Sequence, residues 1–434
     1  MSSNLYVGAG KAYIPYTEDM LPTFGENYNA IHDLPMLQVL LLQSAENFAI
    51  ISVDVVILDI KQKMAQMASS MLGISEDHIL IHATHVLATP HFKEWDSTEA
   101  WMQEHGGVTK EQAEIFVNRE NKIVGAHMEA LQKACHMAEK SLKPAKLGFG
   151  TAQAKIAVNR VIETSSGWWQ GVNQEGPTDP TVFVVRIDDM EGNLMAVLYN
   201  CNVAPGCMEF STVNGGRMIS GDLASASENY IDSYYGNDVV SIYTTGFTGD
   251  QWQALRARLD YLDNQGNQVI RDLHEAGFYL VDILATRLGE QVIKAVNQIK
   301  TAELSKPIAM DRYEFMYPGQ SVSASSNDGP VRECQYIPCG SQSAEIKVLQ
   351  IEDTAVIACG VELCYETAKR IKENSPYHNT IFMEFTTKGF GYLPEAVFYD
   401  RMSFQSRKSR FAKGSAEKFG DDVLRSLHTS YRKD

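Results

Sequence analysis

The sequence lacks the marks of several common protein classes. No stretch reaches the roughly 18 uninterrupted apolar residues that a membrane-spanning helix needs. The first residues, MSSNLYVGAGKAYI, contain no basic segment followed by an apolar run, so they do not resemble a secretory signal. The seven cysteines form no CxxC pair and leave one over if the others pair. We therefore expect free thiols, a cytoplasmic location and no membrane partner.

Basic side chains are also scarce. There are 38 Lys and Arg residues against 54 Asp and Glu, which gives a formal net charge of −16. A chain with this balance repels a phosphate backbone, so we expect no nucleic-acid partner. Residues 401–434 depart from the average because they are locally basic. This segment is either a solvated tail or helix or a contact with an acidic neighbour, and the second interpretation predicts a homo-oligomer.

What the chain does have is enough apolar sequence for a large core. Of its 434 residues 44% are hydrophobic, and apolar runs bounded by turn residues alternate with helical patterns. This alternation is typical of an α/β or mixed α+β fold. We expect strands at 36–44, 48–58, 78–85, within 147–165, and at 182–188, 194–201, 238–244, 345–350, 354–360 and 379–386. We expect helices at 59–73, 109–140, 252–262, 275–299 and 362–374.

No repeat and no Pro- or Gly-rich linker divides the sequence. We therefore expect a single large domain over 1–400 built from β-α-β units, with a helical insertion at about 95–142. The basic segment 401–434 follows this domain. The clearest unit runs from 48 to 85 and reads strand, helix, strand. Its last strand ends in HATHVLATPHF, at the position where ligands gather in open α/β sheets.

Three histidines, His82, His85 and His91, fall within ten residues of that strand end. Neutral imidazole is a common zinc ligand. If the strand is extended as far as residue 85, His82 and His85 point to opposite faces, so only one of them can face a given pocket. A metal site here needs a further ligand from elsewhere in the chain.

Three acidic residues stand where strands lead into apparent helices. Glu362 follows the apolar run AVIACG, where it either caps a helix or acts as that further ligand. Asp222 stands ahead of a helix in a pattern typical of capping or anion binding. Asp250, in TTGFTGDQW, is a cap or a site acid, and the glycines before it allow close backbone approach.

Two other motifs have simpler interpretations. Trp168 and Trp169 form a pair in a predicted loop, where they either stack on a substrate or cover the core. The segment VGAGK at 7–11 has neither the spacing of a phosphate-binding loop nor the Ser or Thr after Lys. We therefore exclude a phosphate-binding loop there.

Taken in order along nearly the whole chain, these segments resemble the amino-terminal catalytic domain of neutral/alkaline (non-lysosomal) ceramidases. The resemblance rests on LYVGAGKAYIP, NAIHDLPMLQVLLL, IISVDVVIL, GISEDHILIHATH, GWWQGVNQEGPTDPTVFVVRIDDMEGNLMAVLYN, ISGDLASASENYI, YTTGFTGD, ACGVELCYETAKRIKENSP and GFGYLPEAVFYD. It implies a ceramidase-like fold and a hydrolase that cleaves an amide bond. Family members also carry a carboxyl-terminal sandwich domain, which we expect this chain to lack.

The resemblance further implies a zinc ion held by two His, one Glu and one Tyr. The positions that match are His85, Glu362 and Tyr392. With the candidates above, it gives a predicted catalytic set of His85, Tyr392, Asp250 and His91, a predicted substrate-binding set of Trp168, Trp169, Asn202 and Asp222, and a predicted metal set of His85, Glu362 and Tyr392.

The sequence departs from the family at one metal position. The second zinc-binding histidine falls on Asn202 or Val203, and the second histidine of the family's HTH motif is replaced by Leu87. An amide oxygen is a poor substitute for imidazole, because zinc prefers nitrogen and sulfur ligands. The expected site therefore holds three of the four family ligands.

Three functional hypotheses follow. The leading one is a cytoplasmic hydrolase, metal-dependent or not, that cleaves a C–N or C–O bond of a small polar metabolite, because a chain without an anchor is poorly placed to cut ceramide. The second is a metal-independent acid/base enzyme, an isomerase, lyase or glycosidase, acting on a sugar-like substrate. The third is a binding protein with a degenerate zinc site.

Overall fold

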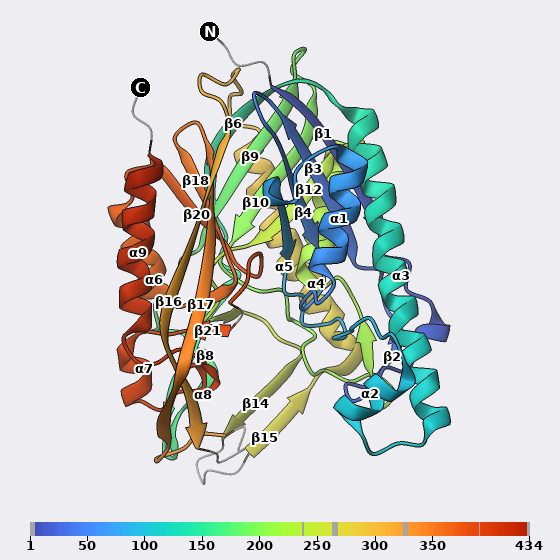
Figure 1. Cartoon of the computed structure of the whole chain (residues 1–434), viewed down its shortest axis with the longest axis vertical. Helices are drawn as coiled ribbons and strands as arrows, with labels where there is room; N and C mark the ends of the chain where they lie inside the picture. Colours follow the sequence, from blue (N-terminus) through green and yellow to red (C-terminus); the bar gives the residue numbers. More distant parts are fainter. Residues whose placement is uncertain (1–4, 237, 263–267, 324–328, 390, 432–434) are drawn as a thin grey trace.

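The computed structural model describes residues 5–236, 238–262, 268–323, 329–389 and 391–431. They form one domain of mixed helices and strands, in which two large sheets pack face to face (Figure 1). Between the sheets lie side chains such as Leu42 and Ile242 from one and Val356 and Met383 from the other. The predicted single mixed α/β domain is confirmed.

The larger sheet has the strand order β12-β10-β9-β6-β1-β3-β4-β5. Its strands are β1 (Tyr6–Tyr13), β3 (Met36–Gln43), β4 (Asn47–Val53), β5 (Ile79–Ala83), β6 (Lys143–Gln153), β9 (Thr181–Asp189), β10 (Leu194–Cys201) and β12 (Val240–Thr245). The second sheet has the order β16-β17-β18-β20, from β16 (Ala309–Ser323), β17 (Gln335–Ile351), β18 (Thr354–Cys359) and β20 (Asn379–Met383). The pairs β4/β5, β10/β12 and β18/β20 are parallel.

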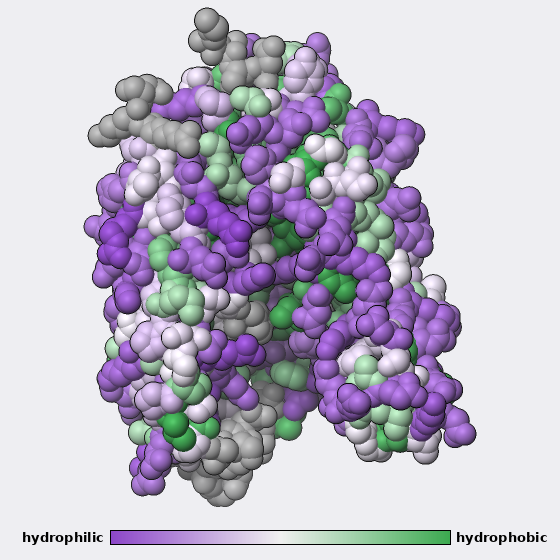
Figure 2. Space-filling model, viewed as in Figure 1, coloured by the Kyte–Doolittle hydropathy of each residue, from purple (hydrophilic) through white to green (hydrophobic). Residues whose placement is uncertain are grey.

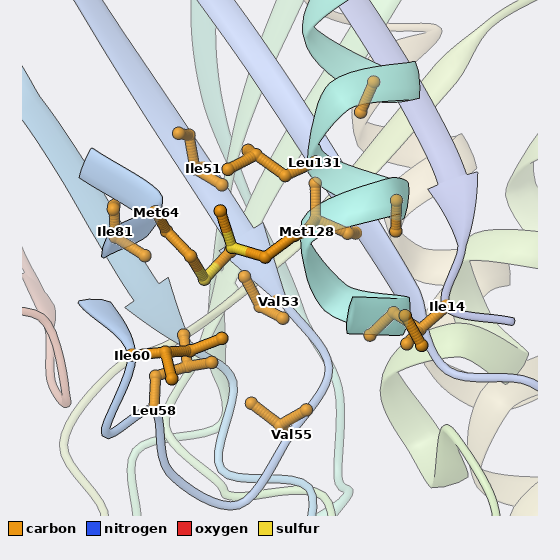
Figure 3. Close-up of a cluster of buried hydrophobic side chains, with 14 of the residues drawn as sticks. Ile14, Ile51, Val53, Val55, Leu58, Ile60, Met64, Ile81, Met128 and Leu131 are labelled. Atoms are coloured by element: carbon orange, nitrogen blue, oxygen red, sulfur yellow. The ribbon is translucent and has the colours of Figure 1, made fainter. Parts of the chain in front are cut away.

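Helices cover the outer face of each sheet. Helices α1 (Lys61–Leu72) and α3 (Lys110–Ser141) cover one half of the larger sheet, and α4 (Asp222–Tyr235) and α5 (Phe278–Val296) cover the other. Helices α6 (Tyr365–Asn374) and α9 (Ser415–Ser430) cover the second sheet. Figure 3 shows Met64 of α1 and Met128 and Leu131 of α3 packed against strand residues such as Ile51.

Smaller elements connect these layers. They are β2 (Tyr28–Ile31) with β11 (Arg217–Ile219), β7 (Ala157–Thr164) with β8 (Gly167–Asn173) and β13 (Gln251–Gln253), β14 (Arg258–Leu262) with β15 (Gln268–Asp272), β19 (Val361–Leu363) with β21 (Gly391–Leu393), helices α2 (Thr98–His105), α7 (Ala396–Asp400) and α8 (Phe404–Lys408), and the short 3-10 turns Glu18–Met20, Glu76–His78 and His274–Gly277. No helix in the described part of the chain is long and apolar enough to span a membrane. All seven cysteines are free, as expected.

Several local predictions are confirmed and others are wrong. The β4-α1-β5 unit forms as expected, and α1 ends at Gly73, whose backbone is left-handed. The helix expected at 252–262 is absent, because residues 251–253 pair with β7 and residues 258–262 pair with β15. The tryptophan pair lies in strand β8 and not in a loop.

The end of the chain is part of the core. Helix α9 buries Phe419, Val423 and Leu427 against the second sheet and α6. A solvated tail is therefore the wrong interpretation for residues 415–430, while residues 432–434 lie outside the described residues. The stretch 95–142, predicted as an insertion, contains α3, which packs directly on β1 and β3.

Gly10 shows why the VGAGK segment has its glycines. Strand β1 runs so close to α3 that a Cβ at Gly10 would lie 2.1 Å from the Ala134 carbonyl oxygen and 2.8 Å from the Ala138 nitrogen. These are backbone atoms of the helix and cannot turn aside. The motif is therefore a helix-packing feature.

We expect Gly10→Ala to lower the free energy of unfolding by about 1–3 kcal/mol or more, because overpacking must push α3 away from the sheet. The matched control is Gly125→Ala in the exposed face of α3, where nothing lies near the added carbon. The free energy of unfolding of that variant should rise by up to about 1 kcal/mol, because alanine has a higher helix propensity than glycine. Urea unfolding of both variants measures the difference, and equal stabilities would contradict this account of the β1–α3 contact.

Candidate functional site

The carboxyl ends of parallel strands from both sheets meet at one place. Thr245, at the end of β12, donates its hydroxyl to the Thr84 carbonyl just after β5, at 2.6 Å, and accepts at its own carbonyl from the Glu384 N–H just after β20, at 3.2 Å. The His82 ring joins the same three segments, since Nε2 accepts from the Thr245 N–H and Nδ1 bonds the Glu384 carbonyl. Both ring nitrogens of His82 are thus used in holding the strands together.

The Glu384 carboxyl fixes two further loops at this place. It is fully buried, and its Oε2 accepts from the backbone N–H and the hydroxyl of Thr248, while Oε1 accepts from the Leu363 N–H at 2.6 Å. Burial raises the pKa of Glu384. The loop after β12 and the short strand β19 are therefore tied to one side chain.

Glu362 and Tyr392 lie side by side as a result. They are direct partners in the parallel pair β19/β21, although 30 residues separate them in the chain. The Glu362 side chain is buried, and the neighbouring Tyr392 hydroxyl favours its ionised form. Burial raises the pKa of Glu362 to about 7, in spite of the opposing effect of Arg160. The prediction that Glu362 caps a helix is wrong, because α6 begins three residues later, at Tyr365.

Arg160 projects into this pair from β7. The strand pairing with β8 shifts register between Asn159 and Val161, and such a bulge re-aims the side chain of the extra residue. The Arg160 guanidinium donates to the Tyr392 hydroxyl and to the Gly249 carbonyl, both at 2.9 Å. Its exposed fraction is 8%, so a permanent positive charge is held inside the protein.

His85 lies within electrostatic range of Arg160. Its Nδ1 lies 2.6 Å from the Val56 carbonyl, so Nδ1 carries the proton and Nε2 carries the lone pair. The ring stacks on Phe385 with centroids 4.0 Å apart. Burial, and to a smaller extent the positive charge of Arg160, lowers the pKa of His85 to about 4. His85 is therefore neutral at neutral pH.

The structure pairs two of the three predicted metal ligands, Glu362 and Tyr392, beside a cation. Arg160 interacts electrostatically with His85, Glu362 and Tyr392. Within the described ranges, no three His, Cys, Asp or Glu side chains are grouped so that they could hold a metal ion. A zinc ion at this position would lie beside the positively charged Arg160 guanidinium, which already bonds Tyr392, one of the expected zinc ligands. The donor set present does not fit zinc.

A pocket of about 420 Å³ opens above Arg160 and Tyr392. Its walls carry Trp169, Phe210, Trp252 and Phe404, from β8, the loop after β10, β13 and α8. Elements β8, β14, β21 and α8 lie together in the lower part of Figure 1, and the largely hydrophilic surface is hollowed beside them in Figure 2. The volume lies within the range of small-molecule sites.

The two tryptophans of the predicted substrate site separate. Trp169 lines the pocket and packs edge-on against Phe404. Trp168 faces the other side of β8, where it packs against the cluster of Val161, Cys364 and Phe398 and has the Arg401 guanidinium 4.0 Å from its ring centroid. Trp169 is therefore placed where it could stack on a substrate, whereas Trp168 packs over buried apolar side chains.

Asp250 and Asp222 lie beneath the site as supports. Asp250 accepts from Asn159, Gln251 and the Tyr365 N–H that begins α6, and burial raises its pKa to about 6. Asp222 accepts from the backbone N–H groups of residues 207, 208 and 223, and thereby orders the loop that carries Glu209 into the pocket.

The remaining two candidates lie elsewhere around the site. His91 bonds the Glu26 carboxyl at 2.9 Å, and its side chain is largely exposed. Asn202 packs its carboxamide oxygen against Gly246 and donates at 3.4 Å to the Asp179 carbonyl. Neither residue lines the pocket above Arg160.

The sequence interpretation missed Arg160 and Arg256. Arg160 stands in the largely apolar run IAVNRVIE, which was a signal, because a charge inside an apolar strand has to find a partner. No local pattern marks Arg256, whose pairing with Glu209 at 2.5 Å arises only in the fold.

Comparison with known proteins supports the fold. Two solved structures match almost the whole chain, a ceramidase complexed with C2 and neutral ceramidase from Pseudomonas aeruginosa. The first has 12% identity, a TM-score of 0.70, and coverage of 98% of this chain and 75% of that one. The second has 12% identity, a TM-score of 0.71, and coverage of 100% and 76%. No family model and no curated protein matches the sequence. The chain therefore has a ceramidase-like fold.

We expect Glu384→Gln to lower the free energy of unfolding by about 1–3 kcal/mol, because an amide leaves either the Leu363 or the Thr248 N–H without its acceptor. The control is Glu373→Gln, an exposed glutamate on α6, which should change little. Urea unfolding checks both variants. A Glu384→Gln protein as stable as the control would show that this carboxyl does not hold the loops.

Proposed function

We propose that this protein is a hydrolase that cleaves a C–N or C–O bond of a small polar substrate with a metal-free catalytic centre. The ceramidase-like fold supports the hydrolase class. The observation that carries the metal-free centre is the Arg160 guanidinium, which bonds Tyr392 at 2.9 Å and interacts electrostatically with His85 and Glu362. The cytoplasmic location and the homo-oligomer stay predictions of the sequence.

Arg160 and Tyr392 are suited to stabilise an oxyanion. When water adds to a carbonyl carbon, negative charge develops on the carbonyl oxygen, and preorganised donors in a dry site lower that barrier. The guanidinium supplies a fixed charge with several N–H donors, and the tyrosine supplies a hydroxyl whose pKa burial raises. Both residues line the pocket.

Glu362 is suited to move the proton. A carboxyl with a pKa near 7 exchanges protons well at neutral pH. In the proposed step, Glu362 takes a proton from the attacking water and then gives it to the leaving amine or alcohol as the C–N or C–O bond breaks. Neutral His85, with its Nε2 lone pair, orients that water.

The first test is the metal. Protein purified without chelators should contain no stoichiometric zinc, and hydrolysis of 4-nitrophenyl acetate or 4-nitroacetanilide should be unchanged by EDTA. Elemental analysis and a chelator titration measure both. Stoichiometric zinc, with activity lost on chelation and restored by zinc, would contradict the metal-free centre.

The second test is the guanidinium. Arg160→Met should reduce the turnover rate by roughly two to three orders of magnitude, the usual loss for one oxyanion donor. Arg160→Lys keeps the charge and should retain more activity if the fold is intact. The control is Arg287→Met, an exposed arginine of α5. Unchanged turnover in a folded Arg160→Met protein would exclude this role, and no turnover in the wild type would favour the binding-protein hypothesis.

A further inference from the structure

Side chains satisfy the free edge of strand β12. One side of the strand pairs with β10, and the other side faces β1 and β4. On that side three backbone N–H groups donate to ionisable side chains, since those of residues 241, 243 and 245 bond Asp232, Glu228 and His82 at 3.0, 2.7 and 2.9 Å. The way in which β12 is held therefore depends on the protonation of these side chains.

Asp54, just after β4, bonds the same region from the other half of the sheet. Its Oδ2 accepts from the Ser225 hydroxyl of α4 at 2.6 Å, and its Oδ1 accepts from the Thr84 hydroxyl at 3.0 Å. Glu228 lies one helical turn after Ser225, so both project from the same face of α4. Asp54 and Glu228 are fully buried, and each affects the ionisation of the other. Their carboxyls therefore lie together between β4 and α4.

One oxygen of this pair lacks a donor. The Tyr243 N–H supplies Glu228 Oε1, but no N–H or O–H group among the described residues reaches Oε2, which is buried. A carboxylate oxygen in that position is costly, because burial removes it from water and offers no hydrogen bond in return. A proton on Oε2, donated to Asp54, turns the oxygen into a donor and removes one of two adjacent negative charges.

The surrounding ionisable groups do not neutralise the pair in another way. Lys11 of β1 bonds Asp232 and the Val239 carbonyl, so its charge is already paired. His82 is neutral, since burial lowers its pKa to about 3. The other titratable groups near the pair are acids and tyrosine hydroxyls, namely Asp222 and Asp232 on α4, Tyr13 on β1, Tyr199 on β10 and Tyr243 on β12.

We infer that Asp54 and Glu228 share one proton and act as a pH-sensitive lock, which holds α4 and β12 on the β4–β5 half of the larger sheet. Loss of the proton leaves two carboxylates side by side in the interior, where their repulsion weakens this contact. Because Asp54 also holds Thr84, the residue before His85, opening of the lock loosens the seat of His85. The inference goes beyond the proposed function, because it holds whether or not the protein is a hydrolase.

The lock opens as the pH rises. Burial raises the pKa of both carboxyls, and the charge of Asp54 raises that of Glu228 further. A group whose pKa is higher in the folded than in the unfolded chain stabilises the fold at low pH, and this contribution is lost as the pH rises through the folded value. The contribution of the pair to the free energy of unfolding should therefore fall from neutral toward alkaline pH.

The test replaces the protonated acid by an amide. In Glu228→Gln the amide oxygen can still accept the Tyr243 N–H, and the amide nitrogen donates to Asp54 at every pH. Relative to this variant, the unfolding equilibrium constant of the wild type should rise by up to about tenfold per pH unit between about pH 6 and pH 9, because unfolding releases one proton. Urea unfolding measures both proteins. The control is Glu290→Gln, at an exposed position of α5, which should follow the wild type.

Parallel pH profiles of the wild type and Glu228→Gln overturn the inference. A Glu228→Gln protein that does not fold also overturns it, because the amide reproduces the protonated acid. Infrared spectra give an independent measurement on the folded proteins. The wild-type spectrum minus that of Glu228→Gln at neutral pH should contain the carbonyl stretch of one protonated carboxyl, because other buried acids such as Glu362 cancel. A difference spectrum without that band, as a bound cation in place of the proton would give, overturns the shared proton.

Discussion

The buried charge of Arg160 is the constraint around which the site is built. An isolated charge in the interior costs several kcal/mol, so a fold that keeps one must surround it with acceptors and counter-charge. Here the Gly249 carbonyl, the Tyr392 hydroxyl and the Glu362 carboxyl serve that purpose. The same arrangement that makes the charge tolerable also brings together groups to which we assign proton transfer and oxyanion stabilisation.

The backbone around Arg160 is held by further hydrogen bonds and close packing. The Arg160 N–H donates to the Asp250 carbonyl at 2.9 Å, and Gln405 adds a bond of 3.1 Å to the Gly249 carbonyl that the guanidinium uses. Gly249 itself packs on β19 so closely that a Cβ would lie 2.8 Å from the Leu363 backbone. Catalytic geometry needs this kind of support, because a displacement of about 1 Å can cost orders of magnitude in rate.

The sequence predicted what depends on local pattern and missed what depends on long-range pairing. The β4-α1-β5 unit and the stop at Gly73 follow from periodicity and turn chemistry, and they are confirmed. The sequence left both Asp250 and Glu362 open as a helix cap or a site residue. In the structure Asp250, and not Glu362, accepts the backbone N–H that begins α6. The sequence could not show this, because that N–H belongs to Tyr365, 115 residues away from Asp250. Residues 252–262 have apolar side chains at helical spacing, but their pairing with β7 and β15 overrides that preference.

The basic segment at the end of the chain also gains a physical role. Its second half, α9, is held by apolar packing, so its charges do not determine where it lies. Its first half lies against the tryptophan pair, with Arg401 over Trp168, Arg407 over Trp169 and Lys408 at the pocket. Part of the charge asymmetry that first suggested a contact with another subunit is thus engaged in contacts within the chain itself.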